Sequence, residues 1–351
     1  MSANTSIEWT ATVHPDGSVT KGRTWNPVRG CSIVSPGCIN CYAMKQAHRF
    51  SGKGRAYEGL TKQTSAGPQW TGKVRTVESA LLDPLKWRKP QRVFVNSMSD
   101  LFHEGVPDAF VDRVFAAMSL AKRHTFQILT KRPERMREYF ACQDAHGFSR
   151  ESNINGAIWS TLGTPRGSKI HHGGDWRCKW PLPNVWLGVS AENQQAADER
   201  IPLLLETPAA VKFVSLEPLI GPIDIRWGTP GGRFKQYLPA PGPPGHPRDR
   251  FHWLNWIIVG GESGPGARPC DVAWIRSIVE QCQSASVPVF VKQLGARPTD
   301  GWNAEAIVVD VEALRSKRGA PNSFTLQNRK GGDPSEWPAD LRVRQFPGEA
   351  R

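Results

Sequence analysis

Residues 92–100 have the sequence Arg-Val-Phe-Val-Asn-Ser-Met-Ser-Asp, in which a short apolar run changes abruptly to small polar residues. An apolar run without polar alternation predicts a strand that is buried on both faces, as in a parallel sheet. The same pattern, an apolar run followed by a polar or glycine-rich cluster, recurs along the chain. The predicted strands are 92–95, 126–129, 185–189, 211–214, 256–259 and 287–291.

Helical patterns lie between these strands. Residues 108–118 and 272–279 repeat apolar side chains near i, i+3 and i+4, as one face of a helix requires. Alternating strands and helices predict an α/β fold with a partial or closed parallel (β/α) barrel, similar to a TIM barrel. We expect the barrel to span 1–298, with insertions near 141–183 and 226–254, and to carry a C-terminal extension, 299–351, packed on it.

Polar clusters follow each predicted strand. Because ligands bind at the carboxyl ends of barrel strands, these clusters are candidate site residues. Each cluster taken alone is explained equally well by helix N-capping, but a series that mixes acids, bases and hydroxyls favours a site. The candidates are Ser97, Ser99, Asp100, Lys131, Ser190, Glu217, Gly260, Gly261, Glu262 and Lys292.

Composition restricts the class of protein. The chain has 351 residues, and 45 basic against 32 acidic side chains give a net charge of 45 − 32 = +13. This surplus, together with 14 tryptophans, favours a nucleic acid or a nucleotide as partner, although a solubilising surface would also be basic. Neither a transmembrane-length apolar run nor a signal-peptide pattern is found, so we expect a cytoplasmic protein that does not bind membranes.

Three of the seven cysteines, Cys31, Cys38 and Cys41, lie in a loop-forming stretch, 25–43, that is rich in glycine and proline. A reducing compartment disfavours disulfides, so a metal site is the first hypothesis. Three thiolates suit an iron–sulfur cluster with one iron left open to a ligand. The alternatives are a structural zinc, with His48 as the nearest fourth ligand, or three unligated cysteines.

A second group of potential metal ligands lies in the first predicted insertion. Its members, Cys142, His146, His171, His172 and Cys178, have a loose spacing. A zinc site there is a weaker interpretation than an exposed loop.

The cysteine spacing and the polar strand ends together resemble a radical S-adenosylmethionine (SAM) enzyme. More closely, the chain resembles the phage-associated family named after gene products thirty-seven and sixty-eight. Leu129-Thr-Lys131 and the Cys38-to-Tyr42 stretch are also similar to spore photoproduct lyase, although C-x6-C-x2-C is wider than the common C-x3-C-x2-C. The stretches that carry the family resemblance are 7–10, 25–43, 93–102, 127–135, 184–193, 213–222, 256–269 and 288–293.

The resemblance implies that Cys31, Cys38 and Cys41 hold a 4Fe-4S cluster whose open iron chelates SAM. It also implies an external reductant such as flavodoxin or ferredoxin, and it leaves room for a partner protein. Cleavage of SAM would release a 5′-deoxyadenosyl radical that abstracts hydrogen from a substrate, while the protein positions and shields the reactants.

The resemblance also suggests roles for the other candidates. Ser97, Ser99 and Asp100 would contact the SAM amino group, and Lys131 would bind its carboxylate. Ser190 would contact the ribose or the carboxylate. The remaining candidates are Tyr42, Gly260, Gly261 and Glu262 as cofactor contacts. Glu217 and Lys292 are candidates for catalysis or substrate contact, and a salt bridge at the mouth of the barrel explains each of them equally well.

The leading hypothesis is therefore a radical SAM enzyme that modifies a base or reverses a lesion in DNA, RNA or a nucleotide. The first alternative is a radical SAM enzyme acting on a peptide or small metabolite. The second is a nucleic-acid-binding protein stabilised by zinc or a cluster, without catalysis.

Overall fold

The computed structural model describes residues 3–13, 16, 18–143, 146–162, 180–226, 228, 236–239, 253–300 and 326–348. These residues fall into two compact units. The first unit contains the described residues up to Val189, together with Leu203–Lys212. The second contains Ser190–Pro202 and the described residues from Phe213 onward, apart from those assigned to the first.

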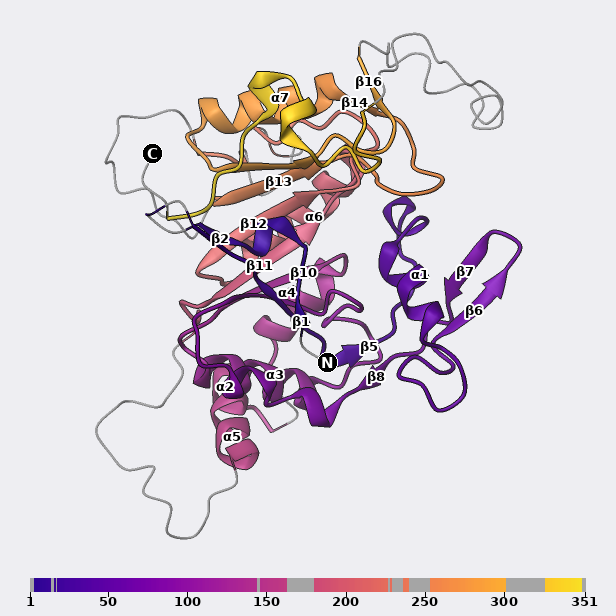
Figure 1. Ribbon diagram of the computed structural model, residues 1–351. Helices are drawn as coiled ribbons and strands as arrows, with labels where there is room; N and C mark the ends of the chain where they lie inside the picture. The colour runs from indigo at the N-terminus through magenta and orange to yellow at the C-terminus, as the bar shows by residue number, and fades with distance from the viewer. Residues whose placement is uncertain are drawn as a thin grey trace. The chain divides into compact units, whose positions relative to one another are not determined.

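The main sheet is an open parallel sheet of the half-barrel kind (Figure 1). Its strand order is β1-β4-β9-β10-β11-β12-β13-β15, with β1 antiparallel to β4. The order does not close on itself among the described strands, so the predicted parallel α/β fold is confirmed as a partial barrel. The bounds are β1 Ala3–Asn4, β4 Arg23–Trp25, β9 Arg92–Val95, β10 Thr125–Thr130, β11 Val185–Ser190, β12 Val211–Leu216, β13 Trp256–Gly260 and β15 Val289–Gln293.

Every strand predicted from an apolar run is present, with its ends shifted by a few residues at most. The reason is burial: all six residues of β11 and all five of β13 are buried, as a strand covered on both faces requires. The two predicted helices are α3, Asp108–Leu120, and α7, Val272–Ser284. The other long helices are α4, Pro133–Ala141, α5, Arg150–Leu162, and α6, Gln194–Glu206.

One parallel strand was missing from the predictions. β4 pairs in parallel with β9 through Trp25 and Val95, so the cysteine-containing stretch follows the first parallel strand instead of preceding the whole series. A strand of three residues leaves almost no periodic signal in a sequence. Trp25 anchors it, because its ring is fully buried and its Nε1 donates a 2.7 Å hydrogen bond to the Ala80 carbonyl.

Residues 26–76, here called the 26–76 segment, leave the sheet after β4 and return beside their starting point. Their first strand, β5 (Val28–Arg29), pairs antiparallel with their last, β8 (Arg75–Thr76). Between these strands lie the cysteines, helix α1 (Tyr42–Arg49) and a hairpin of β6 (Thr61–Thr64) and β7 (Gly67–Trp70). Figure 1 shows α1 and this hairpin on the same side of β5 and β8.

The predicted insertion at 141–183 contains α5, which packs on α3 in the first unit. A buried polar cluster joins the helices: Tyr139 Oη donates to Asp112 over 2.6 Å, and Arg150 Nη1 lies 3.3 Å from the same carboxylate. The rest of that insertion, 163–179, lies outside the described residues, as does most of the predicted insertion 226–254.

In the second unit, Phe213, Trp256 and Phe290 form an aromatic core around β13. The described part of the predicted C-terminal extension lies along β15: the Val291 amide donates to the Val343 carbonyl over 2.8 Å, and the Gln345 amide to the Val289 carbonyl over 2.9 Å. It thereby covers an edge that would otherwise expose unpaired backbone groups. Residues 301–325 lie outside the described chain.

The extension contains two short 3-10 turns, Pro334–Glu336 and Ala339–Leu341. The remaining short elements are a β2–β3 hairpin (Thr12–Val13 and Val19–Thr20), the two-residue strands β14 (Cys270–Asp271) and β16 (Pro298–Thr299), and α2 (Asp83–Lys86). Further 3-10 turns span Glu8–Thr10, Pro36–Cys38 and Glu78–Ala80. No helix in the part of the chain described here is long and apolar enough to cross a membrane.

Candidate functional site

The carboxyl ends of β4 and β9 are joined by two asparagines. The Asn96 amide donates to the Trp25 carbonyl over 2.7 Å, and its side-chain Oδ1 accepts from the Val28 amide at 3.3 Å. Asn26 Oδ1 accepts in return from the Met98 amide at 3.0 Å. Asn96 has a φ of 60°, a left-handed conformation that asparagine tolerates better than most residues. The start of the cysteine loop is thus fixed to the β9 strand end.

Gly30 directs the chain into the cysteines. Its φ is 89°, and a Cβ there would lie 2.3 Å from the Lys73 carbonyl oxygen, so only glycine allows the two backbones to come this close. On its other side Gly30 forms a parallel bridge with Ser99. The backbone directly before Cys31 is therefore fixed on both sides, by Lys73 and by Ser99.

Cys31, Cys38 and Cys41 are all partly buried and free of disulfides. Cys31 and Cys41 pack against the same apolar cluster, which includes Met44 and Trp70. Burial and, to a smaller extent, the nearby Asp100, Cys41 and Cys38 raise the pKa of the Cys31 thiol to about 12, although Arg132 opposes them. Burial also raises the pKa of Cys41. The thiols are thus close enough to influence one another.

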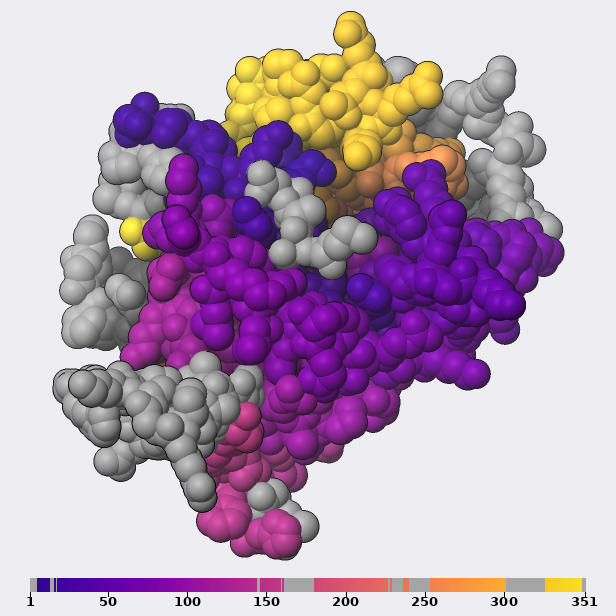
Figure 2. Space-filling model, turned by 60° about the horizontal axis from the view of Figure 1, so that its bottom comes forward, coloured from indigo at the N-terminus to yellow at the C-terminus, as the bar shows by residue number. Residues whose placement is uncertain are grey.

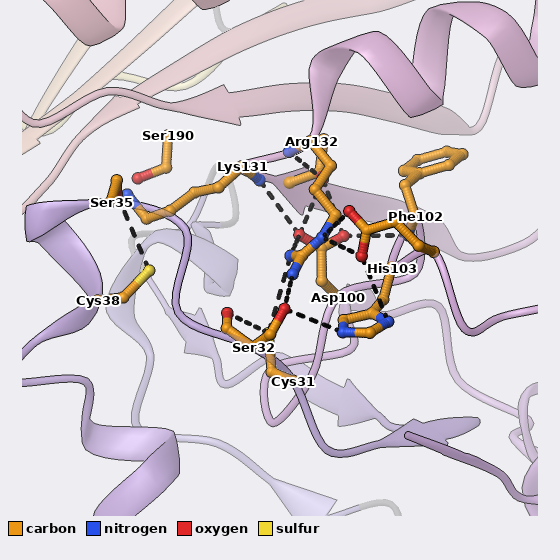
Figure 3. Close-up of polar contacts among 12 residues, drawn as sticks. Cys31, Ser32, Ser35, Cys38, Asp100, Phe102, His103, Lys131, Arg132 and Ser190 are labelled. Atoms are coloured by element: carbon orange, nitrogen blue, oxygen red, sulfur yellow. Dashed lines mark hydrogen bonds and ion pairs between the residues drawn. The ribbon is translucent and has the colours of Figure 1, made fainter. Parts of the chain in front are cut away.

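Arg132 connects the cysteine loop to the ends of β9 and β10 (Figure 3). Its Nη2 donates to Ser32 Oγ over 2.5 Å, and its Nη1 lies 3.9 Å from Cys31 Sγ and 3.0 Å from Asp100 Oδ2. Its Nε donates to Glu104 over 3.0 Å. The Arg132 side chain is only 5% exposed, so these partners neutralise a buried cation.

The side chain of Asp100 is fully hydrogen-bonded within the first unit. Its carboxylate accepts hydrogen bonds from Thr130 Oγ1 at 2.8 Å and from the Phe102 and Lys131 amides at 3.0 and 3.2 Å, besides Arg132. With these donors it holds the β10 strand end against the turn after β9. The geometry makes Asp100 a positioning residue for the loop.

The two serines predicted to bind cofactor also bond within the loop. Ser99 Oγ donates to the Val28 carbonyl over 2.7 Å, and Ser97 Oγ donates to Asn26 Oδ1 over 3.3 Å. Tyr42, whose ring is 56% exposed, donates its hydroxyl to the Ser97 carbonyl over 2.7 Å. Lys131 is half-buried at the end of β10. The structure therefore brings the first-unit candidates to the same strand ends as Cys31.

As a donor set, three thiols from one loop suit an iron–sulfur cluster. In the conformation described here, however, no three His, Cys, Asp or Glu side chains of the described residues are arranged as a group that could hold a metal ion. His48, the fourth zinc ligand considered above, has its Nδ1 3.0 Å from Thr61 Oγ1. Cys142 is exposed, while His171, His172 and Cys178 lie outside the described residues.

The remaining candidates belong to the second unit, where several of them bond with one another. Lys292 Nζ lies 2.5 Å from Glu217 Oε1, which also accepts from Gln293 Nε2 at 3.2 Å. Ser190 Oγ donates to the Glu217 backbone carbonyl over 3.1 Å. Glu217 and Lys292 thus form the salt bridge that was the structural alternative to a substrate-contacting role.

Gly260 and Gly261 have a packing reason to be glycine. A Cβ on Gly261 would lie 2.4 Å from the Leu294 carbonyl oxygen, and one on Gly260 would lie 3.1 Å from that of Gln293. Glu262 forms a bidentate pair with Arg268, at 2.6 Å from Nη2 and 3.0 Å from Nε. These contacts hold the end of β13 beside the residues that follow β15.

Sequence reasoning missed Arg132, Asn26 and Asn96. Arg132 follows Lys131 directly, and a basic pair at the start of a helix indicates a solvated surface unless its partners are known. Its acidic partners are 32 and 28 residues away in sequence, since they are Asp100 and Glu104. Asn96 did carry a signal, because it comes directly after a predicted strand, where a side-chain acceptor can bridge to a neighbouring loop. Asn26 follows β4, which no pattern in the sequence predicted.

Residues 4–330 match the model of a protein family described as a protein of unknown function, DUF5131. The chain belongs to the DUF5131 family. The match covers both units, including the 26–76 segment and the Glu217–Lys292 pair. No curated protein matches this DUF5131 chain, and no solved structure does either.

Proposed function

We propose that this protein is a radical SAM enzyme in which Cys31, Cys38 and Cys41 hold a 4Fe-4S cluster. The observation that carries the proposal is the loop itself: three partly buried thiols, none in a disulfide, follow the first parallel strand of a half-barrel sheet. Such a cluster, when bound, supplies the electron that cleaves SAM into methionine and a 5′-deoxyadenosyl radical.

The chain's own groups would position the reactants. Arg132 holds the cysteine loop through Ser32 and lies beside Cys31 Sγ, where a cation favours thiolate over thiol. Lys131, next to it in the chain, offers an ammonium for the carboxylate of an amino-acid ligand. Asp100 keeps both residues at the end of β10 through the Thr130 hydroxyl and the Lys131 amide.

The substrate we propose is a nucleic acid or a nucleotide. Support comes from the net charge of +13, since a surplus of this size attracts polyanions. A base modification or lesion reversal fits a hydrogen-abstracting radical, because such a radical breaks unactivated C–H bonds of sugars and base methyl groups, which are too weakly acidic for ordinary acid–base catalysis.

The proposal is tested by anaerobic reconstitution with iron and sulfide. Electron paramagnetic resonance of the dithionite-reduced protein is then recorded with and without SAM. Wild type should give a cluster signal that changes when SAM is added, and Cys38→Ala should lose it. Cys142→Ala is the matched control, because Cys142 is exposed and outside the loop, and it should behave as wild type. Stoichiometric zinc without iron would refute the radical mechanism and favour a binding protein.

A further inference from the structure

Positive charge is concentrated in the 26–76 segment. It contains eight basic residues and one acidic residue, so 8 − 1 = +7 of the net charge of +13 lies in this stretch. The basic residues are Arg29, Lys45, Arg49, Lys53, Arg55, Lys62, Lys73 and Arg75. The acid, Glu58, accepts a 2.7 Å hydrogen bond from the Gly54 amide.

Six of these eight cations lack acidic partners among the described residues. In the rest of the described chain many bases form ion pairs, for example Arg137 with Glu206 and Arg276 with Asp340. Within the segment, six exposed bases form no ion pair with any described acid. They are Arg49, Lys53, Arg55, Lys62, Lys73 and Arg75. The counterions of such unpaired cations stay mobile in the solvent, so the phosphate groups of a nucleic acid can replace them.

Helix α1 adds aromatic rings to this surface. Tyr42, Lys45 and Arg49 are spaced i, i+3 and i+7, which places them on one side of the helix. The opposite side is buried against the apolar cluster through Ala43, Met44 and Ala47. Tyr42 is 56% exposed, and Phe50, directly after the helix, is 44% exposed. Exposed rings next to cations are the combination that stacks on bases while contacting the backbone.

The hairpin supports a polyanion over a lipid surface as the partner. The residues of β6 are Thr-Lys-Gln-Thr, and the exposed large apolar side chains of the segment all lie before the hairpin; they are Ile33, Val34, Ile39, Tyr42 and Phe50. A membrane-binding hairpin would need such side chains to enter the acyl region. Figure 2 shows indigo and violet atoms of the N-terminal part of the chain at the surface.

We infer that the exposed side of α1 and the β6–β7 hairpin form a docking surface for the phosphate backbone of a nucleic acid. The surface begins one residue after Cys41, so a bound strand would pass next to the cysteine loop. This inference rests on the proposed function, since it narrows the proposed substrate to a nucleic acid strand and says where that strand binds. Binding itself requires no cluster.

The test is fluorescence anisotropy with labelled oligonucleotides, single-stranded and duplex, over a series of salt concentrations. The triple variant Arg49→Gln, Lys53→Gln, Lys62→Gln removes three exposed cations. The matched control, Arg88→Gln, Lys89→Gln, Lys122→Gln, removes three exposed cations outside the segment. Each phosphate contact contributes about 0.7 to the salt slope for a single strand, so the test variant should lose about 2 units and the control almost none.

Affinity at low salt should also fall at least about tenfold in the test variant alone, because phosphate contacts supply most of non-specific binding. Equal behaviour of the two triple variants would overturn the inference. So would retention of vesicles containing phosphatidylserine with no retention of oligonucleotide. Measuring Cys38→Ala in parallel separates the two proposals: oligonucleotide binding without a cluster supports this surface even if the radical mechanism fails.

Discussion

Arg132 donates a hydrogen bond from Nη1 to Asp100 Oδ2 over 3.0 Å, and the two side chains are 5% and 7% exposed. A buried cation next to a buried anion is stable only while both are present. Because Arg132 also reaches Ser32 Oγ at 2.5 Å, the pair links the ends of β9 and β10 to the cysteine loop. Changes in this pair should therefore affect the geometry around Cys31.

Replacing Arg132 should cost far more than replacing an exposed arginine. We expect Arg132→Ala to lower the free energy of unfolding by about 3–5 kcal/mol, because Asp100 would stay buried without its cation. Arg113→Ala is the control: its pair with Glu78 spans 2.7 Å but is exposed, so we expect a loss of about 0.2–1 kcal/mol. Urea unfolding measures both, and equal losses would contradict a buried pair.

Asn96 should be sensitive to the backbone conformation as well as to its side-chain acceptor. We expect Asn96→Ala to destabilise the first unit, because alanine at a φ of 60° is strained by about 1–2 kcal/mol and the acceptor for the Val28 amide is lost. Asn96→Gly also removes the acceptor, but glycine adopts this backbone conformation without strain. The loss of stability should therefore be smaller than for alanine. Thermal unfolding compares the two variants. An alanine variant as stable as wild type would rule out both the backbone strain and the contribution of the Asn96 side chain.

The Glu217–Lys292 pair should be coupled energetically. A double-mutant cycle with Glu217→Gln and Lys292→Met should give a coupling of about 1.5–3 kcal/mol, the usual range for a hydrogen bond to a partly buried charged group. The exposed pair Asp224–Arg226, at 2.7 Å, serves as the control and should give a clearly smaller coupling, because solvent screens both charges. A coupling near zero for Glu217 and Lys292 would leave both groups available for a substrate.

Stability should decrease on mild acidification. Burial lowers the pKa of His124 below its usual 6.5, and burial lowers that of His103 in the same direction. The unfolded chain then binds more protons than the folded chain, so stability is full above about pH 6.5 and is lost as the pH falls below it. His124→Gln should make the decrease in melting temperature between about pH 7.5 and about pH 5.5 shallower. An unchanged decrease would show that His124 contributes nothing to it.

Much of the fold could be predicted because parallel strands are buried on both faces and therefore carry an uninterrupted apolar signal. Trp256 to Val259 and Val185 to Val189 are examples, and their strands β13 and β11 extend only one residue further. β4 could not be predicted in the same way, since Arg-Thr-Trp has no periodicity and becomes a strand only by pairing with β9. Tertiary pairing overrides local propensity there.

The candidate site was predictable in its location but not in its internal bonding. Polar residues after β9 and β10 do meet the cysteine loop, as the shared edge of parallel strands requires. That Asp100 would accept hydrogen bonds from Thr130 and Arg132 depends on side-chain positions that no spacing rule specifies. For the same reason, only the family resemblance singled out Lys131 rather than Arg132 as a site residue. In the structure, Arg132 is the buried one of the two.

The 26–76 segment is tied at its base by the pairing of Val28 with Thr76 and by a 2.7 Å hydrogen bond from the Val77 amide to the Pro27 carbonyl. Both ends of the stretch therefore lie at one place on the first unit. A continuous piece of coding sequence thus carries the thiols together with the basic surface. Exchanging this segment would transfer both at once, but the contacts of Val28, Gly30 and Ser32 with Asn96, Ser99 and Arg132 would have to be matched as well as the two ends.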